Sequence, residues 1–214
     1  MKKQIADFWS KNAPYLGYDD PYISRFKDEP QVKDLLDTYF HKGEQVLEVG
    51  CGLGYDSKYL RNKGCIVYPI DLSQENALKA GGLCMDAEDL EFGVESFDKV
   101  WSYGVLHHTP NTQKAIDEIH RVLKVGGEAV IMLYHKGYAW WYLKLLGKST
   151  NDYDHTPLSK MYSRKQIRKM FSKFRGRCCW VSAFEGNKTT YKILSKHKWL
   201  KDRFGSFIII HAIK

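Results

Sequence analysis

Three glycines stand at alternate positions in the segment VLEVGCGLG, which covers residues 46–54. An apolar run precedes them, as expected of a buried strand, and a pattern typical of a helix follows. Glycine allows backbone conformations and a close approach to a ligand that a side chain would prevent. The free N–H groups at the start of the next helix can receive polar atoms of that ligand. The segment therefore predicts a strand–loop–helix turn, built on Gly50, Gly52 and Gly54, that binds a nucleotide or nucleoside.

The acids around this loop narrow the choice of ligand. Asp71 ends the next predicted strand, about 20 residues on, where an acid commonly holds both ribose hydroxyls. The dinucleotide pattern G-x-G-x-x-G would require glycine at position 55, which is Tyr55. Glu48 stands two residues before the first glycine, and its carboxylate favours a cationic sulfonium or ammonium over a pyrophosphate. The acids thus favour S-adenosylmethionine over a dinucleotide.

The elements that must position these residues alternate between strand and helix. Expected strands cover residues 45–49, 65–70, 83–85, 97–103 and 129–134, and expected helices cover 55–63 and 113–124 with another from Pro30 to Gly43. Short connections between them argue for a parallel sheet covered on both faces. A capping box at Ser163 and Gln166 predicts a further helix. Two last strands, 179–184 and 206–212, have no clear crossover helix between them, which predicts an antiparallel edge.

Several motifs in register resemble the class I S-adenosylmethionine-dependent methyltransferases. They are the glycine loop, IDLS (70–73), MDAEDL (85–90), SFDKVWSYGVLHHTPN (96–111) and IHRVLKVGGEAVIML (119–133). FWSKN, YISRF and PLSKMYSRKQIRKMF are similar to a small-molecule, methyltransferase-11/25-like branch. The resemblance implies an α/β, Rossmann-like, doubly wound, mostly parallel seven-stranded sheet, with an antiparallel C-terminal edge strand and helices on both faces. It also implies one domain over residues 1–214, in which segment 1–42 and insertion 135–162 form a substrate cap.

The resemblance further implies S-adenosyl-L-methionine as cofactor and S-adenosyl-L-homocysteine as product. In isolation Asp86 would more readily be a turn cap, but its place in the series suggests contact with the adenine amino group. Ala87 would contact the adenine ring edge, Leu72 would lie beside it, and Tyr103 and Gly104 would lie under the sulfonium. The implied cofactor-binding set is Glu48, Gly50, Cys51, Gly52, Gly54, Asp71, Leu72, Asp86, Ala87, Tyr103, Gly104 and His107.

Two adjacent histidines follow the fourth strand, where a base could act on an acceptor hydroxyl. His107 and His108 titrate near neutrality, so either could take the acceptor proton, with Tyr103 as a further catalytic candidate. The alternative is that one histidine contacts the cofactor while the other packs against or caps the loop. Transfer to an acceptor that is already nucleophilic would need little acid–base help.

Aromatic residues crowd the segments expected to cover the site. They suggest a small acceptor that is apolar, aromatic or anionic, although core packing is an equal alternative for any single one. The candidate acceptor-binding residues are Trp9, Tyr18, Tyr22, Arg25, Tyr134, His135, Tyr138 and Trp141.

Composition limits the remaining possibilities. The net charge is +8, yet residues 156–214 hold 15 lysines and arginines against two acids, a local balance of +13 that leaves −5 for residues 1–155. That asymmetry would suit RNA or a nucleotide, but a solvated lysine-rich face is favoured, and the nucleic-acid alternative ranks below a small molecule. Five cysteines without metal-ligand spacing predict a reduced cytoplasmic protein with no metal site. No apolar run is long enough to span a membrane. A cofactor-binding protein without catalysis remains a third alternative, and the sequence leaves the oligomeric state open.

Overall fold

The computed structural model describes residues 1–14, 16–150, 155–182 and 205–214, with 138–139 and 177–182 described by their backbone alone. Its strands are β1 (Gln45–Val49), β2 (Ile66–Asp71), β3 (Leu83–Cys84), β4 (Phe97–Tyr103), β5 (Leu123–Tyr134), β6 (Gly176–Ser182) and β7 (Phe207–Ile213). Its helices are α1 (Lys2–Lys11), α2 (Pro21–Asp28), α3 (Pro30–Tyr39), α4 (Tyr55–Asn62), α5 (Gln74–Lys79), α6 (Thr112–Val122), α7 (Tyr138–Leu145) and α8 (Arg164–Met170), with the 3-10 turn η1 (Leu106–His108).

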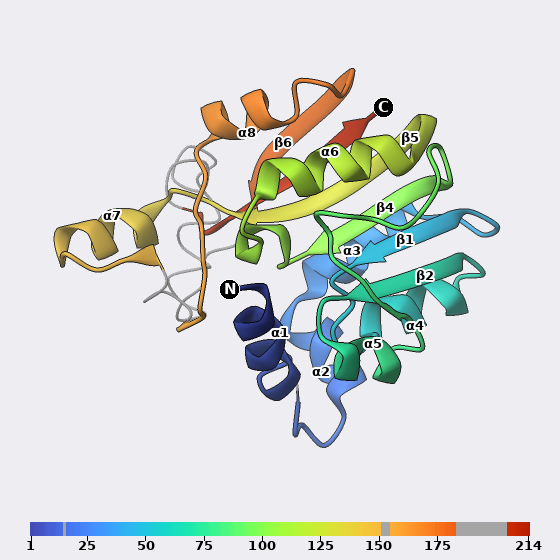
Figure 1. The fold of residues 1–214 in the computed structure, drawn as a ribbon, viewed down its shortest axis with the longest axis horizontal. Helices are drawn as coiled ribbons and strands as arrows, with labels where there is room; N and C mark the ends of the chain where they lie inside the picture. Colours follow the sequence, from blue (N-terminus) through green and yellow to red (C-terminus); the bar gives the residue numbers. More distant parts are fainter. Residues whose placement is uncertain (15, 151–154, 183–204) are drawn as a thin grey trace.

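The strands form one sheet in the order β3-β2-β1-β4-β5-β7-β6 (Figure 1). β1 lies in parallel between β2 and β4, with Leu47 opposite both Tyr68 and Val100. Four of the five β1 residues are buried, because the strand is covered on both faces. The carboxyl ends of β1, β2 and β4 therefore meet at one edge of the sheet, where the glycine loop, Asp71 and Tyr103 lie.

The antiparallel pairing predicted for the C-terminal strands is confirmed. β7 runs antiparallel to both of its neighbours, with Ile210 opposite Ile131 on β5 and opposite Cys179 on β6. β7 lies one position inside the edge, and β6 is the outermost strand. The mostly parallel, Rossmann-like architecture expected from the sequence is thus confirmed.

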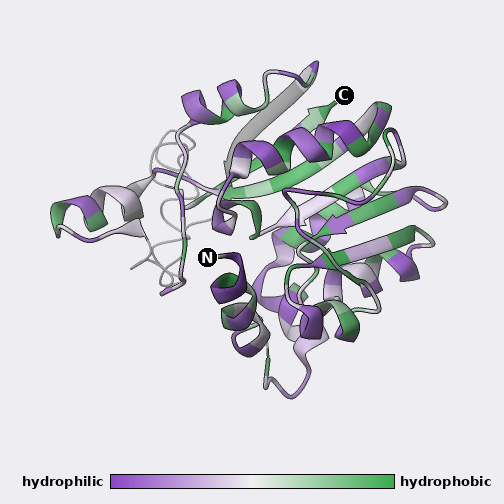
Figure 2. Cartoon of the chain, viewed as in Figure 1, coloured by the Kyte–Doolittle hydropathy of each residue, from purple (hydrophilic) through white to green (hydrophobic). Residues whose placement is uncertain are grey.

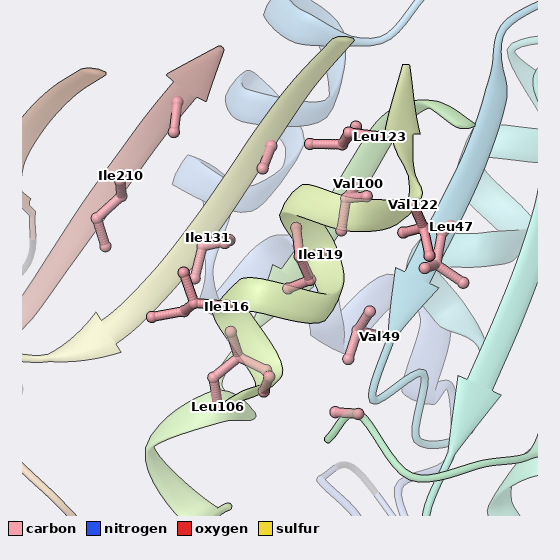
Figure 3. Close-up of a cluster of buried hydrophobic side chains, with 14 of the residues drawn as sticks. Leu47, Val49, Val100, Leu106, Ile116, Ile119, Val122, Leu123, Ile131 and Ile210 are labelled. Carbon is pink, nitrogen blue, oxygen red and sulfur yellow. The ribbon is translucent and has the colours of Figure 1, made fainter. Parts of the chain in front are cut away.

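Helices cover both faces of the sheet. α6 and α8 lie on one face, where Ile116 and Ile119 of α6 pack against Val100 and Ile131 (Figure 3). On the other face, Leu36 of α3, with other residues of α3 and α4, packs against the sheet. Hydrophobic residues follow the central strands, whereas the helices mix both kinds (Figure 2). The two cores fix the sheet edge that carries the site.

Some boundaries differ from the sequence expectation. β5 begins at Leu123, six residues before the predicted strand. Gly126 and Gly127 do not form a loop; they lie in a register shift within this strand, between the residues that pair with Phe97 and Lys99 of β4. β6 covers Gly176–Ser182 rather than 179–184, and residues 183–184 lie outside the described part. The capping box of Ser163 and Gln166 is confirmed at the start of α8.

The first two helices, α1 and α2, were not expected from the sequence, whereas α3 confirms the helix predicted from Pro30. Their residues pack near the start of the glycine-loop helix and α5, on the side of the sheet edge that holds the loop (Figure 1). Asp20 caps α2 through a bond from the Ile23 N–H, and Pro21 follows at the first helical position. The side-chain amide of Asn76 on α5 donates to the carbonyl of Trp9 at 3.2 Å. This hydrogen bond connects α1 to α5. Among the described residues, no helix is both long and apolar enough to cross a lipid bilayer.

Candidate cofactor and active site

A cavity of about 720 Å³ opens at the carboxyl ends of β1, β2 and β4. Ligands of open α/β sheets bind at this edge, beyond the strand ends. Ten of the twelve residues proposed for the cofactor line it, namely Glu48, Gly50, Cys51, Gly52, Asp71, Leu72, Asp86, Ala87, Tyr103 and Gly104. Trp9, Arg25, His108 and Tyr134 line the same cavity.

The glycine loop needs two of its glycines for different reasons. Gly50 has φ +77°, and a Cβ there would lie 2.3 Å from a methyl group of Val105. Gly52 has φ +51°, and a Cβ there would meet nothing within 4 Å, although the residue lines the cavity. Gly50 is thus required by packing, whereas Gly52 keeps an open space beside the loop for a ligand.

Asp71 is oriented by the backbone at the end of β2. Its carboxylate accepts from the Gly52 N–H at 2.9 Å and from the Ser73 N–H at 2.8 Å. Burial raises the pKa of Asp71, although these two N–H donors oppose the rise. The carboxylate is therefore fixed beside the loop and can accept further bonds, as a ribose diol would supply.

Glu48 is a buried acid that lines the cavity. The Ser57 hydroxyl donates to its Oε2. Burial raises the pKa of Glu48 well above its usual range, and the nearby charge of Asp56 raises it further. A cationic ligand group at this carboxylate would reduce the cost of ionising it.

The sequence did not predict the network of charged residues beside Glu48. Asp56, in the first turn of α4, accepts from the Arg25 Nε at 3.0 Å, the Arg25 Nη2 at 2.9 Å and the Trp101 indole N–H at 3.0 Å. Burial is the largest single effect and lowers the pKa of Arg25, but the charge and hydrogen bond of Asp56 and the charge of Glu29 together outweigh it, so the pKa rises. Arg25 Nη1 also donates to Glu29 Oε1 at 2.5 Å. The N-terminal helices therefore bring a buried charge into the site.

Asp86 is paired with the N-terminal helix. The Lys2 ammonium lies 2.5 Å from Asp86 Oδ2 and 2.9 Å from Glu88 Oε2. Asp86 Oδ1 accepts the Glu88 N–H, so the carboxylate is oriented by its own turn. α1 is thus held across the end of the cavity proposed for adenine.

The two histidines have different environments. His108 lines the cavity, and its Nδ1 lies 2.7 Å from the carbonyl oxygen of Leu158. Because that oxygen can only accept, Nδ1 carries the proton and Nε2 is the basic nitrogen of the neutral ring. His107 is fully buried, stacks on Tyr134 at 3.7 Å between centroids, and lies outside the cavity lining. Of the pair, only His108 is placed to act on a bound acceptor.

Burial accounts for the state of His107. In the part of the chain that the structure describes, neither ring nitrogen has a hydrogen-bond partner. Burial lowers the pKa of His107 well below its usual range, and the neighbouring His108 adds to this effect. The ring is therefore neutral, and direct contact with a cofactor, as the resemblance implied, does not follow from its position.

Several other candidates lie outside the cavity lining. Gly54 is buried against Ala80, which a Cβ would approach to 2.7 Å. His135 is buried with Nδ1 2.9 Å from the Gly205 carbonyl, and Tyr22 packs against Phe26. Tyr18 and Trp141 are exposed, with exposed fractions of 54% and 60%. The side chain of Tyr138 lies outside the described residues.

The comparisons with known proteins agree with this architecture. Residues 47–131 match the family model described as a methyltransferase domain. Over these residues the chain has a class I S-adenosylmethionine-dependent methyltransferase domain. The matched segment runs from β1 to β5 and includes the glycine loop, Asp71, Asp86 and both histidines.

Two curated relatives match this chain over part of their own length. Phosphoethanolamine N-methyltransferase 2 of Caenorhabditis elegans is 31% identical over 137 residues, which are 57% of this chain and 29% of the relative. Ubiquinone biosynthesis O-methyltransferase of Coxiella burnetii is 29% identical over 132 residues, which are 52% of this chain and 56% of the relative. The match thus covers less than two thirds of each relative.

Solved structures share the fold. A Haloferax volcanii putative methyltransferase, in complex with the Trm112 methyltransferase activator, superposes with a TM-score of 0.70 at 18% identity, over 100% of this chain and 97% of that chain. Haemonchus contortus phosphoethanolamine N-methyltransferase 2 in complex with S-adenosyl-L-methionine gives 0.63 at 19% identity, over 87% and 52%. At these identities the likeness supports the fold of the methyltransferase domain alone.

Proposed function

We propose that this protein transfers the methyl group of S-adenosyl-L-methionine to an oxygen or nitrogen atom of a small-molecule acceptor and releases S-adenosyl-L-homocysteine. The observation that carries the proposal is the cavity, which joins the glycine loop, Asp71 and Asp86 to the side chain of His108. The same cavity therefore offers a cofactor site and a candidate base. Phosphoethanolamine and a ubiquinone precursor, named for relatives with matching segments, illustrate nitrogen and oxygen acceptors.

The residues at the loop fit this cofactor. A Cβ at Gly52 would project into open space, and one at Gly104 would approach only Met132, at 3.7 Å. In the proposal, Asp71 holds the ribose hydroxyls, Asp86 accepts from the adenine amino group, and Glu48 receives the ammonium. When bound, the cofactor supplies an electrophilic methyl group on a sulfonium.

His108 is the proposed general base. Its Nε2 can take the proton of an acceptor hydroxyl or ammonium, since Nδ1 is committed to the Leu158 carbonyl. Trp9 lies against this ring, with 5.1 Å between centroids, and helps to hold its orientation. Holding acceptor and methyl donor in near-attack geometry can supply about 7–11 kcal/mol of the barrier.

The acceptor region is mostly apolar and aromatic. Met132, Tyr134 and Phe207 line the cavity together with Trp9 of the N-terminal segment 1–42. We propose that segment 1–42 and insertion 135–162 cover the acceptor, which favours a small apolar or aromatic molecule. The nucleic-acid alternative depends on the basic C-terminal third, of which residues 183–204 lie outside the described part. It therefore stays second to the small-molecule acceptor.

Calorimetric titration with S-adenosyl-L-methionine and S-adenosyl-L-homocysteine, with NAD as control, tests the cofactor. Micromolar binding of the sulfur cofactors alone is expected, and binding of NAD alone would overturn the proposal. An acceptor panel of amines and phenols, read by release of S-adenosyl-L-homocysteine, tests transfer. His108→Ala should lower turnover on a hydroxyl acceptor about 10²- to 10⁴-fold with its cofactor affinity retained, whereas the exposed His41→Ala should lower neither.

A further inference from the structure

Arg25 contacts two acids that differ in how firmly they are held. Asp56 accepts from both the Nε and the Nη2 of Arg25, while Glu29 contacts only Nη1, at 2.5 Å. All three side chains line the cavity. The guanidinium thus lies between a buried partner on α4 and a partner on the N-terminal segment.

Asp56 is the fixed partner. Its side chain is 7% exposed and lies in the first turn of α4, the helix that follows the glycine loop. It also accepts a hydrogen bond from the Trp101 indole N–H at 3.0 Å. Glu29 belongs to the link between α2 and α3, and its side chain is 27% exposed. Glu29 is therefore the more exposed of the two acids, and it also hydrogen-bonds with the Tyr103 side chain. A ligand carboxylate that replaced Glu29 at Nη1 would keep the guanidinium paired, whereas loss of Asp56 would also leave the Trp101 indole N–H without this acceptor.

The charges around Arg25 match those of an amino acid. Glu48 lines the same end of the cavity and is close enough to Arg25 for the two charges to interact. A buried carboxylate beside a guanidinium complements an α-ammonium beside an α-carboxylate. In the structure, the carboxylate of Glu29 already occupies one donor of that guanidinium.

We propose that Glu29 is an internal competitor for Arg25, and that the α-carboxylate of the cofactor displaces it when the methionine end binds. This inference rests on the proposed function, because it takes S-adenosyl-L-methionine as the cofactor. Arg25 is then a cofactor-positioning residue rather than an acceptor-binding one. The exchange couples occupancy of the methionine end to the link between α2 and α3.

Glu29→Gln provides the direct test. The amide oxygen can still accept from Arg25, but the competing charge is gone, so the fold is retained. The dissociation constant of S-adenosyl-L-homocysteine should fall about 2- to 10-fold, since a neutral amide competes for the guanidinium less strongly than a carboxylate does. The constant of 5′-methylthioadenosine, which lacks the amino-acid part, should stay unchanged. Both are measured by calorimetry.

Two further variants sharpen the result. Asp34→Asn removes one negative charge from exposed α3 surface outside the cavity lining, and should change neither constant. Arg25→Lys loses the planar fork that bridges two carboxylates, so its affinity for S-adenosyl-L-homocysteine should fall at least about 10-fold. Unchanged binding of 5′-methylthioadenosine to Arg25→Lys would show that the cavity is still folded.

The outcomes separate this inference from the proposed function. If the wild-type protein binds neither nucleoside, the cofactor assignment fails. If it binds both and Glu29→Gln leaves their ratio unchanged, or weakens S-adenosyl-L-homocysteine alone, the exchange is wrong while the cofactor assignment holds. An equal gain for both ligands would show a general electrostatic effect, which also contradicts the exchange.

Discussion

Replacing Gly50 or Gly52 with alanine should separate the packing role of the loop from its binding role. Both residues have positive φ, so alanine at either position costs about 1–2 kcal/mol of backbone strain. Alanine at Gly50 must also displace Val105, whose Cγ2 and Cγ1 would lie 2.3 and 2.4 Å from the new Cβ. Such overpacking typically costs about 1–3 kcal/mol more. Gly50→Ala should therefore lose about 2–5 kcal/mol of unfolding free energy, and Gly52→Ala about 1–2 kcal/mol.

Ligand binding should follow a different order from stability. Relative to its stability loss, Gly52→Ala should weaken binding more than Gly50→Ala does. Because the Cβ at Gly52 meets no protein atom within 4 Å and the residue lines the cavity, the methyl group would occupy ligand space. Gly52→Ala should weaken S-adenosyl-L-homocysteine at least about 10-fold, which is about 1.4 kcal/mol. Urea unfolding gives the stabilities and calorimetry gives the affinities. Gly17→Ala, at φ +85° with nothing within 4 Å, reports the strain alone.

A double variant tests the cause at Gly50. Val105→Ala removes the two methyl groups and leaves only its Cβ, 2.8 Å from the position of the new Cβ. The stability loss of Gly50→Ala with Val105→Ala should therefore be smaller than the sum of the single losses. Strict additivity, or equal stability losses at Gly50 and Gly52, would refute the reasoning from close contact.

Two further predictions concern buried titratable groups. Burial, with the charge of Asp56, raises the pKa of Glu48, so the folded state binds a proton more tightly than the unfolded state and stability falls as pH rises above about 4.5. Glu48→Gln should therefore be more stable than wild type at pH 8 in urea unfolding, with the gain shrinking toward pH 4.5; a gain independent of pH would contradict this. Burial lowers the pKa of His107, so the unfolded state binds the proton more tightly and wild-type stability falls below pH 6.5. His107→Phe keeps the stack on Tyr134 and removes two nitrogens that have no partner among the described residues, so it should add about 1–3 kcal/mol, more at pH 5 than at pH 8; a loss at both pH values would show that His107 has a buried partner.

Much of the fold could be predicted because local patterns and long-range packing agree in the central domain. β1 and β4 begin and end at the predicted residues, since their apolar runs are bounded by glycine or polar turns. The start of β5 could not be predicted, because Gly126 and Gly127 normally signal a turn, whereas here they lie in a register shift of one strand and hydrogen-bond with the backbone of Lys214. The N-terminal helices were missed because α1 and α2 contain few apolar residues and are fixed by polar contacts such as Lys2 with Asp86.

The candidate site shows the same division between local and distant information. The loop and Asp71 belong to one strand–loop–helix–strand unit, so their spacing in the sequence carries their proximity. Arg25 and Asp56 are 31 residues apart and in different helices, and nothing in their spacing predicts a bidentate pair. A buried ion pair of this kind offers little net stability, whereas removing one partner costs about 3–5 kcal/mol. We therefore expect the N-terminal helices to complete the cofactor site because this pair lines the cavity beside Glu48, and not because the pair adds stability.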